Sequence, residues 1–182
     1  MHTRQLELAQ AGDEVAFTGL VDLHGGRCYG IAYRILRDAE RAEDAVQQAF
    51  LLAWREIPRL RDPERFEVWL HRLLVNACYE EIRRDRQWSL NVRALPLEGL
   101  PDADQMVSAE QRVALERAFA ILSPEHRAVA VLHHHAGIPL ALIAETTGVP
   151  LGTVKSRLHY ATRILRGALM RDGVEPRKVR SA

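Results

Sequence analysis

A short basic helix near the carboxyl end of the chain has side chains suited to binding nucleic acid. It lies in GVPLGTVKSRLHYATRIL, residues 148–165, where a glycine turn precedes the helix. At about 100° per residue, apolar side chains fall on one side of this helix and polar ones on the other. The apolar side comprises Val154, Leu158, Ala161 and Leu165, and the polar side comprises Lys155, Ser156, His159, Arg163 and Arg166. The polar side suits contacts with phosphates and base edges.

The residues before this helix favour a helix-turn-helix. Ala144 is small where two helices must approach, Gly148 permits the turn, and Val149 is expected to be buried. Thr153, in the first turn of the second helix, can offer its hydroxyl and backbone N–H to a phosphate. We therefore predict a recognition helix for a major groove. The alternative is that this face is merely solvated and that the basic tail beyond Arg171 binds DNA.

A second group of side chains suits unpaired bases. Within residues 63–86, an aromatic ring and an amide alternate with guanidinium groups inside an arc of roughly 60° on one helix. The members of this arc are Arg65, Trp69, Arg72, Asn76 and Arg83. Such a face can stack on bases and read their edges, with the neighbouring Arg84 on phosphate. An ordinary charged, solvated face is the alternative.

A third helical stretch, residues 38–57, carries two distinct rows. One row is apolar at i, i+3, i+4 spacing and predicts a core stripe. Its members are Ala42, Ala45, Val46, Ala49, Phe50, Ala53, Trp54 and Ile57. The other row contains Asp44, Gln47, Gln48, Leu51 and Arg55. A solvated face is one interpretation, but Leu51 and Leu52 widen the apolar arc and favour a partner-binding surface.

No set of residues predicts catalysis, a metal site or a cofactor. The three histidines at 133–135 are consecutive, so on a helix they point about 100° apart and cannot converge on one metal ion. The chain has no glycine-rich phosphate loop, no paired cysteine and histidine, and no nucleophile elbow. We therefore expect that the protein is not an enzyme.

Composition and charge agree with a cytoplasmic, DNA-binding protein. Hydrophobic residues make up 47% of the 182 residues, which is ample for a core. Cys28 and Cys78 form no CxxC pair and suggest reduced thiols, while no stretch resembles a signal peptide or a membrane span. Residues 111–182 carry eleven basic and five acidic side chains, although the net charge of the chain is only +1. Such a segregated basic end is typical of proteins that contact a phosphate backbone.

The helical pattern divides the chain into two small domains and predicts an all-α fold. Aspartates at 13, 38 and 62 and Ser123 occupy expected N-cap positions, and glycines at 137 and 148 occupy expected helix ends. Residues 89–108 lose the periodicity and gather prolines and acidic residues, which indicates a flexible linker. We expect an N-terminal domain over residues 1–88 and a C-terminal helix-turn-helix domain over residues 109–182.

With these elements placed, the chain resembles bacterial RNA polymerase sigma factors of the extracytoplasmic-function type. The resemblance runs from about Ala16 to Leu169 and rests on three segments in order. They are AEDAVQQAFLLAW (42–54), FEVWLHRLLVNACYEEIRR (66–84) and LSPEHRAVAVLHHHAGIPLALIAETTGVPLGTVKSRLHYA (122–161).

The resemblance implies a role for each surface. Polymerase core would bind at Asp44, Gln47, Gln48 and Leu51 on the first domain. The same domain would recognise and melt the downstream promoter box through the face on residues 65–84, with residues 59–63 forming a pocket for a flipped base. The second domain would read the upstream box with Thr153, Lys155, Ser156, His159, Arg163 and Arg166. The resemblance also implies an anti-sigma factor as a partner. It implies no insertion of the protein into a membrane.

Two features depart from the family pattern, and two other functions compete. His24-Gly25-Gly26 is expected to interrupt a helix that is usually continuous, and the triple histidine is unusual. A free-standing helix-turn-helix repressor or activator would explain the basic end but not the row of Asp44, Gln47, Gln48 and Leu51 or the arginine–aromatic face. A metal-dependent nucleic-acid enzyme is a more distant alternative.

Overall fold

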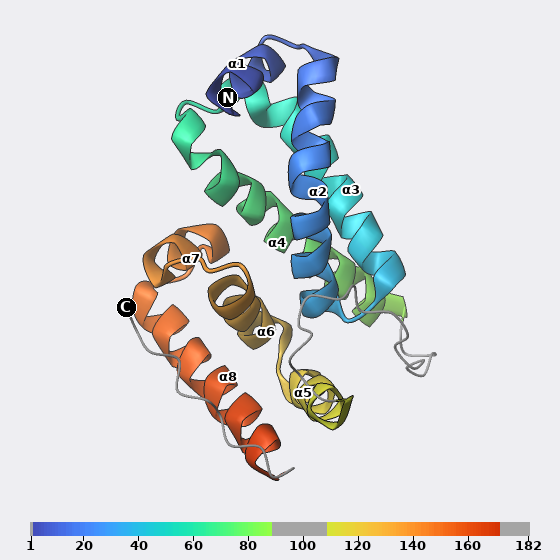
Figure 1. Cartoon of the computed structure of the whole chain (residues 1–182), viewed down its shortest axis with the longest axis vertical. Coiled ribbons are helices and arrows are strands. Elements are labelled where there is room, and N and C mark those ends of the chain that lie inside the picture. Colours follow the sequence, from blue (N-terminus) through green and yellow to red (C-terminus); the bar gives the residue numbers. More distant parts are fainter. Residues whose placement is uncertain (1, 89–108, 172–182) are drawn as a thin grey trace.

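The computed structural model describes residues 2–88 and 109–171, and these residues form helices and short connections without any strand. The first group comprises α1 (His2–Gln10), α2 (Glu14–Leu36), α3 (Ala39–Glu56), the 3₁₀ turns η1 (Ile57–Arg59) and η2 (Pro63–Arg65), and α4 (Phe66–Trp88). The second comprises α5 (Ala109–Ile121), α6 (Pro124–Ala130), the π-helical turn η3 (Val131–His135), α7 (Leu140–Thr147) and α8 (Leu151–Arg171). Figure 1 shows these groups as the upper and lower halves of the molecule. The all-α prediction is therefore confirmed, and the predicted linker at 89–108 lies outside the described residues.

The helices begin and end where the sequence placed their caps. The side chains of Asp13 and Asp38 accept the backbone N–H groups of Ala16 and Arg41, at 2.9 and 3.0 Å. Asp62 and Ser123 cap η2 and α6 in the same way, each followed by proline. Gly148 closes α7 in the left-handed conformation, with φ of 68°. These caps satisfy backbone groups that a helix end otherwise leaves unpaired.

The expected interruption at Gly25 and Gly26 is wrong. Helix α2 runs unbroken from Glu14 to Leu36 through both glycines. Two mid-helix glycines cost roughly 1 kcal/mol each, but Leu20, Cys28 and Ile31 on the core side of α2 are almost completely buried. Burial of such side chains contributes about 1.5–3 kcal/mol each and outweighs the glycine cost.

The two halves share a continuous apolar core. Buried side chains of α1 to α4 and of α6 to α8 belong to one cluster, which extends from Leu6 to Val154. Helix α7 packs against α4, and its Ile143 has no exposed surface. A smaller cluster of Leu122, Ala130 and Ala161 joins α6 to α8. No helix among the described residues has the length and apolarity needed to cross a membrane.

Candidate nucleic-acid and partner interfaces

The predicted recognition helix, α8, has its two sides where the sequence placed them. Val154 and Ala161 are completely buried, and Leu158 and Leu165 are half-buried. The opposite side is exposed at each of its predicted members, Lys155, Ser156, His159, Arg163 and Arg166. The N–H of Thr153 donates to the carbonyl oxygen of Pro150 at 2.9 Å. That N–H is therefore already used within the turn, and only the hydroxyl of Thr153 remains for a phosphate.

The basic side chains on the polar side of α8 have no carboxylate partner among the described residues. Among the ion pairs of the described residues, none involves Lys155, Arg163 or Arg166. Arg163 instead lies over the ring of Tyr160, with its guanidinium carbon 5.4 Å from the ring centroid. Tyr160 is 37% exposed. Sequence reasoning missed it, although at about 100° per residue it lies only about 40° from Ser156 on the helix.

The residues of the arginine–aromatic face lie on α4 and η2 at the predicted positions. Several of its arginines, however, pair with carboxylates. Arg65 at the end of η2 and Arg72, Asn76, Arg83 and Arg84 on α4 are exposed. Trp69 of the same face is half-buried and packs on Phe66, with ring centroids 5.8 Å apart.

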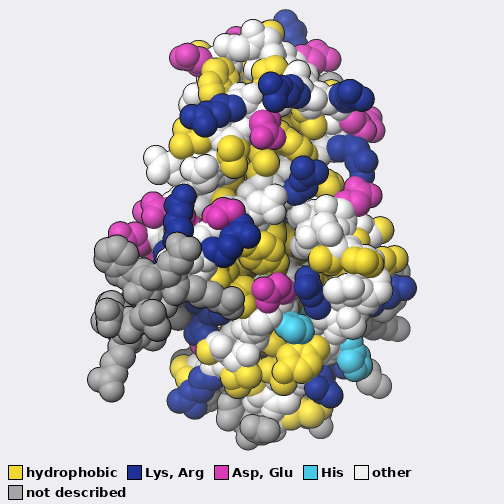
Figure 2. Space-filling view, turned by 180° about the vertical axis from the view of Figure 1, so that it is seen from behind, with side chains coloured by type: hydrophobic (Ala, Val, Ile, Leu, Met, Phe, Trp, Pro, Cys, Tyr) yellow, Lys and Arg dark blue, Asp and Glu magenta, His cyan; other side chains and the backbone are white. Residues whose placement is uncertain are grey.

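Three arginines of the α4 face already hold a carboxylate. Arg83 pairs with Glu80, Arg84 pairs with Glu81 at 2.7 Å, and Arg65 pairs with Glu145 of α7 in the other half of the molecule. Figure 2, which views the molecule from behind, shows acidic and basic side chains mixed over that face. A phosphate must therefore compete with these carboxylates for the arginines.

The seam between the two halves combines apolar packing with polar ties. Arg27 donates to the carbonyl oxygen of Ala136 at 2.6 Å, and Arg37 pairs with Glu116 at 3.1 Å. The buried hydroxyl of Tyr79 on α4 has no hydrogen-bond partner, and burial together with Glu125 of α6 raises its pKa to about 12. The Nε atom of Arg37 is also buried without a partner. Such unmet buried groups cost free energy, so not every polar atom of the seam is satisfied.

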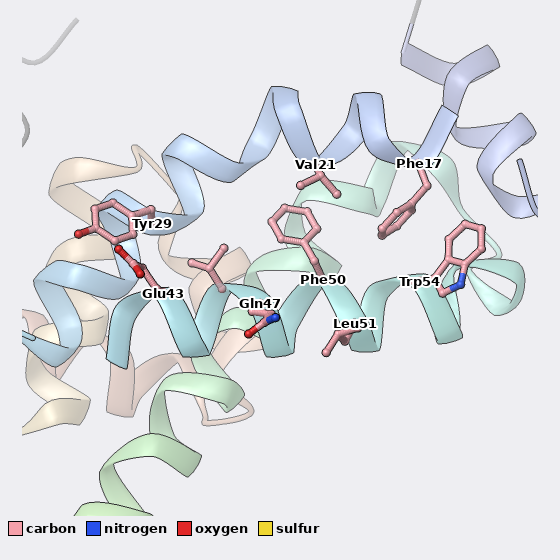
Figure 3. Close-up of a pocket in the computed structure, with 9 residues that line it drawn as sticks. Phe17, Val21, Tyr29, Glu43, Gln47, Phe50, Leu51 and Trp54 are labelled. Atoms are coloured by element: carbon pink, nitrogen blue, oxygen red, sulfur yellow. The ribbon is translucent and has the colours of Figure 1, made fainter. Parts of the chain in front are cut away.

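An apolar groove lies beside the predicted polymerase surface. It has a volume of about 430 Å³ and is lined from α2 by Phe17, Val21 and Tyr29 and from α3 by Glu43, Val46, Gln47, Phe50, Leu51 and Trp54. Figure 3 shows Gln47 and Leu51 on the exposed side of α3, next to the aromatic rings that separate the two helices. Leu51 is 49% exposed.

The structure separates the predicted polymerase row by position. Gln47 and Leu51 border the groove, whereas Asp44 and Gln48 lie on α3 outside its lining. Sequence reasoning missed the contribution of α2 to this surface. The i, i+4 spacing of Phe17 and Val21 was the available signal, because it places both apolar side chains on one side of a helix.

His71 and the two cysteines are buried in the interior of the protein. Burial and the nearby Arg27 lower the pKa of His71 to about 4, and burial raises the pKa of both Cys28 and Cys78 to about 12. His133 and His134 meet edge to face with centroids 4.9 Å apart. Within the described part of the chain, no group of three His, Cys, Asp or Glu side chains could hold a metal ion.

Comparison with known proteins gives a consistent match to both halves. The family described as Sigma-70 region 2 matches residues 20–88, and the family described as Sigma-70, region 4 matches residues 118–167. The ECF RNA polymerase sigma factor SigL of Mycobacterium tuberculosis is 36% identical over 170 residues, which cover 91% of this chain and 96% of the relative. The ECF RNA polymerase sigma factor SigW of Bacillus subtilis is 29% identical over 181 residues, covering 93% and 97%.

A solved structure has the same arrangement of helices. It is the sigma factor RpoE in complex with the anti-sigma factor NepR from Bartonella quintana, with a TM-score of 0.70 and 26% identity. The alignment covers 86% of this chain and 98% of that one.

Proposed function

The chain belongs to the ECF-type RNA polymerase sigma factors, and from this premise we propose which surface carries each part of its function. Members of this family bind RNA polymerase core and promoter DNA and direct promoter-specific initiation of transcription. They are initiation factors rather than catalysts, so no residue here is given a catalytic role. The observation that carries the assignment is the order of the two matched regions, each over a helical domain with an exposed face of the expected chemistry.

The polymerase-binding surface is the side of α3 formed by Asp44, Gln47, Gln48 and Leu51, of which Gln48 is half-buried and the other three are exposed. Its support is physical: Leu51 exposes an apolar side chain at the edge of an apolar groove, while Phe50 is buried and holds α3 against α2. Apolar surface of this kind gains free energy when a partner covers it. The domain that presents it extends over residues 1–88.

The downstream promoter box is recognised by the α4 face, and the upstream box by α8 of the second domain, residues 109–182. Asn76 would read the edge of an unpaired base, while Trp69 would stack and Arg65, Arg72, Arg83 and Arg84 would contact phosphates. Lys155, Ser156 and His159 lie near the start of α8, where a recognition helix meets base edges. Arg163 and Arg166 lie later and would contact the backbone.

The seam has a consequence for promoter binding. Arg65 cannot keep its pairing with Glu145 and also use the same guanidinium hydrogen bonds for a phosphate. The pairing occupies one terminal nitrogen of Arg65, so a phosphate that takes this nitrogen must displace Glu145 of α7, and Glu145 therefore competes with downstream DNA for part of the guanidinium.

Control by an anti-sigma factor is also proposed. The RpoE structure that resembles this chain is a complex with the anti-sigma factor NepR, and it supports an inhibitor that binds the same kind of two-domain arrangement. A free-standing helix-turn-helix regulator is the weaker candidate, because it leaves the groove and the region 2 match without a role.

The polymerase surface can be tested with a matched pair of variants. Leu51 and Leu23 are each 49% exposed, but only Leu51 lines the groove. We expect Leu51→Arg to abolish capture by immobilised core polymerase, and Leu23→Arg to bind as the parent does, with both variants retaining the parent's helical circular dichroism. Equal binding by a folded Leu51→Arg chain would remove this surface from the proposal.

A further inference from the structure

Tyr160 and His126 form a tilted pair of rings that reaches the basic face of α8 from two helices. The rings of His126 on α6 and Tyr160 on α8 have centroids 4.6 Å apart and an interplanar angle of 47°. The guanidinium of Arg163 lies over the Tyr160 ring. Arg163 is three residues after Tyr160, so the two side chains are neighbours on the helix surface.

The inner ring of this pair, that of His126, is held by hydrogen bonds. The Oγ of Ser123 lies 2.7 Å from Oε2 of Glu125 and 2.7 Å from Nδ1 of His126. A carboxylate only accepts, so the single hydroxyl proton of Ser123 goes to Glu125, and Nδ1 of His126 must donate to Oγ. This arrangement sets the tautomer of His126 and the orientation of the ring that meets Tyr160.

The outer end is an arginine that has no carboxylate partner among the described ion pairs. A free arginine side chain has many rotamers, and their loss opposes every hydrogen bond that it forms with a phosphate. A ring beneath the guanidinium restricts those rotamers while it leaves the N–H groups at the edge of the fork available.

We propose that Tyr160, supported by His126, is a positioning residue that pre-orients Arg163 for a DNA backbone phosphate. This inference rests on the proposed function of α8, and it adds α6 to the elements that shape the DNA-binding face. The proposal assigns no base contact to Tyr160. Its effect is carried through Arg163 and is therefore independent of DNA sequence.

The test is a double-mutant cycle in the full chain, with a mixed-sequence DNA duplex of about three helical turns as the probe. Arg163→Ala should weaken binding and reduce the slope of log affinity against log salt by about 0.9. Tyr160→Leu should weaken binding by about two- to fivefold, and Tyr160→Phe should bind as the parent because it keeps the ring. His126→Leu should show a smaller loss in the same direction.

The decisive comparison is made in the Arg163→Ala background, where Tyr160→Leu should have no additional effect. A Tyr160→Leu loss of the same size in that background would show that Tyr160 contacts DNA itself and would overturn the positioning role. The role also fails if Arg163→Ala weakens binding but Tyr160→Leu does not. If Arg163→Ala changes neither affinity nor salt slope, the proposed phosphate contact fails and the positioning role fails with it. Matching circular dichroism and melting temperature exclude a loss through unfolding.

Discussion

The α4 face and the α8 face, the two surfaces proposed to contact DNA, carry similar side chains but differ in the carboxylates around them. On the α4 face, Arg65, Arg83 and Arg84 each pair with a glutamate. On α8, the basic side chains of the polar side take part in no ion pair of the described residues. On the α4 face a phosphate would therefore have to displace a carboxylate at three of the arginines, whereas at the polar side of α8 it would meet no such competitor among the described ion pairs.

This difference suits the two kinds of DNA that the faces are proposed to bind. Duplex DNA presents a dense, regular array of phosphates and rewards an uncompensated basic helix. Unpaired strands are bound by stacking and edge contacts as well as by charge, and the salt dependence per phosphate contact is somewhat smaller than for duplex DNA.

The largest expected effect tests whether the two faces depend on one core. Ile143 of α7 is fully buried where the second half packs on α4. Ile143→Ala should lower the free energy of unfolding by about 2–5 kcal/mol, because it leaves a cavity in the shared cluster. Urea unfolding followed by circular dichroism measures this change. Val113→Ala, at a 49% exposed position of α5, is the control and should change it by no more than about 0.5 kcal/mol.

The next effect separates the faces by the DNA that each binds. Asn76→Ala should weaken contacts with an unpaired base by about 1–3 kcal/mol and reduce permanganate reactivity of thymines in the open complex. Duplex binding by α8 should be unchanged. Lys155→Ala should do the reverse, losing about 1–3 kcal/mol at one base position of the upstream box. If both variants impair duplex binding equally, the division of roles between the faces is wrong.

The buried His71 of the first half should make stability depend on pH. Burial and Arg27 lower the pKa of His71 from 6.5 to about 4, although Glu67 opposes the shift. Because the folded pKa is depressed, the unfolded chain takes up the proton first as the pH falls. Stability is complete above about pH 6.5 and is lost towards pH 4, with a loss of about 2 kcal/mol between about pH 7.5 and about pH 5.

Urea unfolding of the parent and of His71→Leu at several pH values measures this dependence. The variant should lose most of the pH slope, and His159→Leu should keep it. A slope that is unchanged in His71→Leu would assign the dependence to another group.

The smallest effect concerns Glu145, the α7 carboxylate that pairs with Arg65 of the α4 face. The Arg65–Glu145 pair is about half exposed on each side, and such surface pairs are worth about 0.2–1 kcal/mol. Glu145→Gln should therefore strengthen binding of a forked downstream-box probe by a few-fold at most. Glu80→Gln, which releases Arg83 within α4, is a matched control for the loss of one acidic charge. A gain for Glu80→Gln alone would show that the seam does not oppose DNA binding.

The sequence predicted the elements better than their electrostatics. Helix caps at Asp13, Asp38 and Ser123 and the buried side of α8 follow from local spacing, and the structure confirms them. The pairing of Arg65 with Glu145 joins residues 80 positions apart and depends on how the halves pack, which periodicity does not encode. The continuous α2 was mispredicted for a related reason, since tertiary burial outweighed the local propensity of Gly25 and Gly26.

Transcription by core polymerase, with and without the protein, tests the proposed division of labour most directly. Fragmented genomic DNA of the source organism serves as template, and the 5′ ends of the transcripts are sequenced. We expect the protein to direct initiation to a defined set of sites that share an upstream and a downstream box. Lys155→Ala should relax preference only in the upstream box, and Asn76→Ala should reduce initiation at sites that keep both. The same start sites with and without the protein, or one pattern of change for both variants, would contradict the account.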